Sequence, residues 1–105
     1  MKIDIFAHIF PKSYFDKMIE VAPNGQDIHK RVRNVPCIVD LGERFRIMDR
    51  FDEYAQVICI GAPPIEVYGP PPISTEMAKL ANDGMAELVQ KYPDRFLGFI
   101  ASLPM

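Results

Sequence analysis

Residues 2–11 read Lys-Ile-Asp-Ile-Phe-Ala-His-Ile-Phe-Pro, and their apolar alternation predicts a short strand over residues 2–6. Because strand side chains alternate between faces, we expect Asp4, Phe6 and His8 to share one face and the residues between them to share the other. Two histidines spaced as His-x-His at a strand end could bind one metal ion. Here Phe6 occupies the first of these two positions. The stretch therefore predicts half of a metal motif, with His8 as the candidate ligand.

Three helices are predicted downstream of this strand. The first covers about residues 13–21 and the third about residues 75–91, and each begins at a hydroxyl side chain that can cap it. The second covers residues 41–53, where apolar residues recur at helical spacing and should face a core. Asp40 can cap this helix, and Glu43 stands where a capping-box carboxylate would reach back.

Two further strands complete the predicted fold. Residues 55–60 form a near-continuous apolar run that suits a strand buried on both faces, as in parallel sheets, and residues 95–101 form another. Intervening helices of this length imply parallel strands with right-handed connections. We expect the three strands to be neighbours in chain order, with the second and third helices packed on one side. The prediction is an α/β fold of parallel βαβ units, forming one partial domain over residues 1–105.

The composition is that of a soluble globular protein, with 49% hydrophobic and 25% charged residues. A net charge of -2 gives no indication of a broad nucleic-acid surface. Residues 30–33 form a local basic cluster, which is either a solvated loop or a contact for an anionic substrate or partner. Cys37 and Cys59 are predicted to be reduced thiols. With no signal peptide and no membrane-spanning apolar run, we expect a cytoplasmic protein without a membrane partner.

Eight stretches in order along the chain carry a resemblance to a known family. They are MKIDI (1–5), AHIFP (7–11), RFRIMD (44–49), QVI (56–58), PP (63–64), AND (81–83), KYPDRF (91–96) and ASLP (101–104). Together they resemble the amidohydrolase-related (amidohydrolase 2) proteins, which include aminocarboxymuconate-semialdehyde decarboxylase and γ-resorcylate decarboxylase. The resemblance covers most of the chain and implies a (β/α)8 TIM barrel, of which residues 1–105 would supply the first three strands. Such barrels need about 250 residues.

The resemblance also implies a divalent metal, usually zinc, at the carboxyl ends of the barrel strands. His8 matches the second ligand of the first-strand motif, and Phe6 stands where the family has histidine or sometimes glutamate. The family's other histidine ligands and its catalytic aspartate lie on later strands and match no position here. His29, Cys37 and Cys59 show no metal-ligand spacing with His8. The implied chemistry is metal-assisted decarboxylation or hydrolysis of small carboxylated compounds.

The leading interpretation is an amino-terminal fragment of such an enzyme, inactive by itself. Two alternatives stay open: a non-catalytic α/β binding or assembly module, and one chain of a split enzyme. Unpaired strand edges in an unclosed sheet predict self-association or a complementary partner chain. Asp4 is expected to be a buried polar residue, and Arg46 and Asp49 to form surface or interhelical ion pairs. Gly61, with the prolines after it, would either shape a substrate pocket or make a rigid turn.

Overall fold

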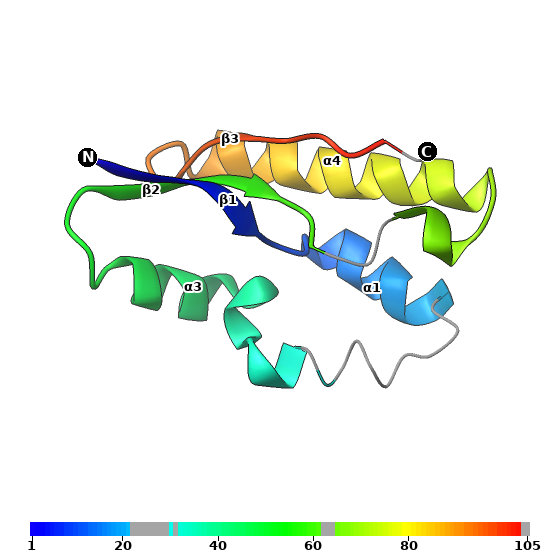
Figure 1. The fold of residues 1–105 in the computed structure, drawn as a ribbon, viewed down its shortest axis with the longest axis horizontal. Coiled ribbons are helices and arrows are strands. Elements are labelled where there is room, and N and C mark those ends of the chain that lie inside the picture. Colours follow the sequence, from blue (N-terminus) through cyan, green and yellow to red (C-terminus); the bar gives the residue numbers. More distant parts are fainter. Residues whose placement is uncertain (22–29, 31, 62–64, 104–105) are drawn as a thin grey trace.

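In the part of the chain that the structure describes, the protein is an α/β structure with one parallel sheet of three strands. The computed structural model describes residues 1–21, 30, 32–61 and 65–103. The strands are β1 (Lys2–His8), β2 (Tyr54–Cys59) and β3 (Phe96–Phe99), and both pairs are parallel in the order β1-β2-β3 (Figure 1). The predicted fold class and strand order are confirmed. The first strand runs to His8 rather than ending near Phe6, and the third is shorter than predicted.

The described helices are α1 (Lys12–Val21), α3 (Leu41–Met48) and α4 (Ile73–Lys91). Two 3-10 turns, η1 (Pro36–Ile38) and η2 (Ile65–Tyr68), precede α3 and α4. The second helix is thus shorter than predicted, and the third begins two residues earlier, so its predicted cap lies inside the first turn. Residues 32–34, predicted to be loop, are helical. His29 and the double proline at 63–64 lie outside the described residues.

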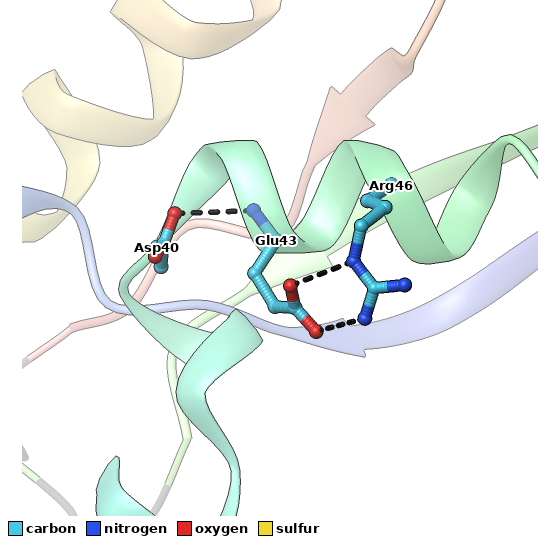
Figure 2. A network of polar contacts seen from close by, with 3 residues as sticks. All are labelled: Asp40, Glu43 and Arg46. Carbon is cyan, nitrogen blue, oxygen red and sulfur yellow. Dashed lines mark hydrogen bonds and ion pairs between the residues drawn. The ribbon is translucent and has the colours of Figure 1, made fainter.

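The start of α3 confirms Asp40 as its cap (Figure 2). The Asp40 carboxylate accepts a hydrogen bond from the backbone N–H of Glu43 at 3.1 Å, which satisfies one of the helix's free amides. The Glu43 carboxylate does not complete a capping box. Instead it accepts two hydrogen bonds from the Arg46 guanidinium, at 2.9 and 2.5 Å. These bonds lower the pKa of Glu43. Arg46 therefore forms the surface ion pair that the sequence predicts.

Helices α1, α3 and α4 contribute to a single core on one face of the sheet. Phe45 of α3 contacts Tyr92, directly after α4, with ring centroids 4.9 Å apart, and Phe96 of β3 at 5.7 Å. Both helices therefore pack against the face that carries Phe96, as predicted. Asp49, the C-cap residue of α3, pairs with Arg95 in the turn before β3, so it forms an ion pair as predicted, but one whose partner lies on no helix. The most deeply buried large side chains are Tyr14, Phe96, Ile9, Met18, Ile58, Met77 and Met85.

The first strand does not alternate regularly. Asp4 is aligned with Gln56 and Ala7 with Ile58, so β1 has one more residue than β2 over this interval. Gln56 and Ile58 lie on the same face of β2, and therefore Asp4 and Ala7 share that face, which is covered by helices. His8 is aligned with the next residue of β2 and lies on the opposite face. The prediction that Asp4 shares a face with His8 is wrong.

A local hydrogen bond explains this irregularity. The Asp4 carboxylate accepts a hydrogen bond from the backbone N–H of Phe6 at 2.9 Å. Aspartate side chains that bond the backbone two residues on compete with the regular ladder, and a β-bulge absorbs the extra residue. Phe6 and His8 remain neighbours, with ring centroids 4.9 Å apart. The predicted proximity of positions 6 and 8 is therefore confirmed.

Exposed apolar side chains gather on the strands and on the segment after β3. Phe6 is 67% exposed, a large fraction for an aromatic side chain in a strand. The others in these regions are Ile3, Ile5, Leu97, Ile100 and Leu103. Within the described residues, every helix is too short or too polar to reach across a lipid bilayer.

Candidate functional site

His8 lies at the carboxyl end of β1, with an exposed side chain. Its ring contacts Phe6, and its position in the sheet is aligned with Cys59 of β2. Its backbone carbonyl accepts a hydrogen bond from the Arg44 guanidinium of α3. The backbone at the end of β1 is therefore fixed by a residue of α3, while the imidazole remains exposed.

The described residues do not assemble a catalytic zinc site around His8. Such a site needs about three protein ligands and an open position for water. No group of three or more histidine, cysteine or acidic side chains comes together in the part of the chain that the structure describes. Cys37 and Cys59 are both free thiols, as predicted. Burial, with a smaller contribution from the charge of Asp4, raises the pKa of Cys59, and a protonated thiol is a poor metal ligand.

A groove of about 740 Å³ lies between α3 and η1 on one side and β1 and β2 on the other. Its volume falls within the range of small-molecule sites. The helical wall is apolar apart from Arg44 of α3, and the sheet side carries polar groups. The rim reaches Phe6, His8 and Gly61. Gly61 thus borders a cavity, which is what the prediction that it shapes a pocket requires. The apolar wall consists of Ile38, Ile47, Met48 and Phe51.

A chain of hydrogen bonds runs along the polar side of this groove. Nη1 of Arg44 donates to Oε1 of Gln56 at 2.7 Å, and Nε2 of Gln56 donates to the Tyr54 hydroxyl at 3.2 Å. The Tyr54 hydroxyl donates to Oδ2 of Asp4, also at 3.2 Å. Asp4 is half-buried and hydrogen-bonded, close to its prediction. The chain links a positive and a negative group that do not touch, through two neutral side chains.

Arg44 is the residue that sequence reasoning missed as a site residue. Only 5% of it is exposed. Besides Gln56 and the His8 carbonyl, its Nε donates to the Cys37 carbonyl at 3.0 Å, so one side chain ties α3 to η1, β1 and β2. Desolvation by burial lowers its pKa, but a guanidinium stays charged in proteins. A signal was present, since Arg44 lies one helical turn before Met48 and so on the predicted core face.

These features define an α/β protein with an open parallel sheet, a lone histidine at a strand end and a groove with a buried arginine. No family model matches the chain. Over 62 residues it is 39% identical to the γ-resorcylate decarboxylase of Polaromonas sp. (strain JS666 / ATCC BAA-500). The match covers 59% of this chain and 19% of that enzyme, so the chain spans about a fifth of its curated relative. The similarity supports the amidohydrolase-related family and does not select a subtype.

Proposed function

We propose that this chain forms the amino-terminal part of a metal-dependent decarboxylase or hydrolase of the aminocarboxymuconate-semialdehyde decarboxylase kind. Its substrates would be small carboxylated compounds, and the chain by itself would be inactive. The observation that carries this proposal is the similarity to γ-resorcylate decarboxylase. The three parallel strands in chain order suit the first three strands of a (β/α)8 barrel. The free thiols suit a cytoplasmic location.

His8 is the metal ligand that we propose for this chain. It lies at the carboxyl end of β1, where the sites of parallel barrels lie. A bound zinc ion would polarise a substrate or activate a water, and the remaining ligands would come from strands outside residues 1–105. Phe6 offers no lone pair, so the first strand supplies one ligand rather than two. The contribution of this chain is to hold the His8 backbone through Arg44.

A chimera tests this proposal. Residues 1–103 would replace the matching amino-terminal segment of the Polaromonas enzyme, and carbon dioxide release from γ-resorcylate would be measured. We expect weak turnover with Phe6 and stronger turnover with Phe6→His, because the second variant restores a two-ligand strand. The matched control is His8→Ala in both backgrounds, which should abolish turnover. A folded, zinc-loaded chimera that is inactive with histidine at both positions would contradict the proposal.

A second candidate function is an assembly module or one chain of a split enzyme. The exposed apolar side chains of the sheet and the open edges of β1 and β3 favour it. In this role the chain pairs with a second copy of itself or with a complementary chain. Sedimentation velocity over a range of concentrations tests self-association. A chain that stays monomeric at every concentration and unfolds cooperatively would argue against pairing with a second copy.

A further inference from the structure

The Arg44 guanidinium has unused capacity to bind an anion. Three of its five N–H groups donate to described acceptors, one each from Nε, Nη1 and Nη2. One N–H on each terminal nitrogen has no acceptor among the described residues. All three acceptors are neutral oxygens. The ion pairs between described residues do not include Arg44. A buried charge of this kind is costly unless an anion compensates it.

The negative group that faces this guanidinium does not neutralise it directly. Asp4 lies at the far end of the hydrogen-bond chain, behind Gln56 and Tyr54, and its carboxylate already accepts two hydrogen bonds. Its charge acts on Arg44 only as a minor influence beside desolvation. An anion can therefore enter at the Arg44 end of the groove, and Asp4 disfavours an anion at the Tyr54 end. The two ends of the groove therefore differ in charge, with the positive group at one end and the negative group at the other.

The shape of the groove indicates an elongated ligand. Its apolar wall follows α3 from Ile38, before the helix, to Phe51, beyond its last residue. Eight helical residues at about 1.5 Å rise each give a wall of about 12 Å, which is long for a single aromatic ring. Ile47, Met48 and Phe51 line the part of this wall at the carboxyl end of α3, and Ile38 lines its other end. An unbranched apolar chain fits this wall.

We propose that the groove binds a medium-chain alkyl carboxylate. The carboxylate accepts the two remaining N–H groups of Arg44, and the alkyl chain lies along Ile47, Met48 and Phe51. The carboxylate would lie at Arg44, next to α3, and His8 is among the other residues that line the groove. This site needs no metal and does not depend on the proposed function.

The test is calorimetric titration of decanoate into the unmodified protein, with decanamide and benzoate as matched ligands. We expect saturable binding of one decanoate per chain, and binding of decanamide weaker by about tenfold or more, because the amide carries no charge for the guanidinium. Benzoate, which keeps the carboxylate but lacks the chain, should also bind more weakly. Equal affinity for decanoate and decanamide, tighter binding of benzoate, or no saturable binding would each overturn the proposal.

Two variants and one control locate the site. Arg44→Lys should weaken decanoate about tenfold, because lysine cannot reproduce the fork of a guanidinium. Ile47→Glu leaves Arg44 in place and should abolish binding by placing a carboxylate in the alkyl path, so the test survives if Arg44→Lys fails to fold. Arg46→Lys, on the exposed side of the same helix, should bind decanoate unchanged. Undiminished binding by Ile47→Glu, or equal losses for Arg44→Lys and Arg46→Lys, would refute the assignment.

Discussion

Replacing Arg44 with methionine should destabilise the fold, because one side chain joins four elements. The substitution keeps an unbranched apolar stem but removes hydrogen bonds to the carbonyls of Cys37 and His8 and to Gln56. Hydrogen bonds from charged groups contribute about 1.5–3 kcal/mol each, and a buried acceptor left unpaired costs about 1–3 kcal/mol. The substitution also removes the desolvation penalty of the buried charge, which offsets part of the lost stability. We expect a net loss of about 2–4 kcal/mol, a large part of the about 5–15 kcal/mol typical of a domain.

Urea unfolding followed by circular dichroism measures this loss, at several protein concentrations so that self-association does not mask it. The matched control is Arg46→Met on the same helix, where the lost pair with Glu43 is exposed and should change the stability far less. A loss below about 1 kcal/mol for Arg44→Met, or equal losses for the two variants, would refute the reasoning. The buried guanidinium would then hold the four elements together no better than methionine does.

Further substitutions probe separate features. Gly84→Ala in α4 should destabilise by about 1–3 kcal/mol in the same unfolding assay, because its methyl would lie 2.5 Å from the Cβ of Pro11; an unchanged midpoint would contradict this close packing. Asp40→Ala should lower the free energy of unfolding by about 1 kcal/mol, because the helix cap is lost. Asp40→Asn should keep most of that stability, because asparagine can also cap a helix. Phe6→His should raise zinc affinity, measured by metal analysis after dialysis, because positions 6 and 8 are in ring contact; the unmodified chain should hold well below one equivalent. Stoichiometric zinc in the unmodified chain, lost on His8→Ala, would show that further ligands exist.

The sheet could be predicted because its determinants are local and repetitive. The apolar run at 55–60 is too short for a helix and too continuous for a solvent-facing strand, so it indicates a buried strand. Asp40 caps α3 by contacting a backbone group three residues away, which sequence spacing shows directly. The element ends were less predictable, since the second helix stops at Met48 rather than near residue 53.

The site was harder to predict because it depends on exceptions to those rules. Alternation placed Asp4 beside His8, but the bond from Asp4 to the backbone of Phe6 moves it to the other face. Arginine is rarely buried, so the helical position of Arg44 indicated a core contact while its chemistry argued against one. Its acceptors belong to segments up to 36 residues away along the chain, and no spacing pattern identifies them.

The two register shifts of the sheet lie beside the same part of β2, residues 56–58. The extra residue of β1 falls between Asp4 and Ala7, and β3 gains one between its alignments with Gln56 and Val57. Bulges increase local twist and bend the strand that carries them, so both outer strands should curve away from a plane around the middle of β2. A curved, coiled edge is a poor template for flat stacking of many chains. Its open edges should therefore favour finite, closed assemblies over fibres.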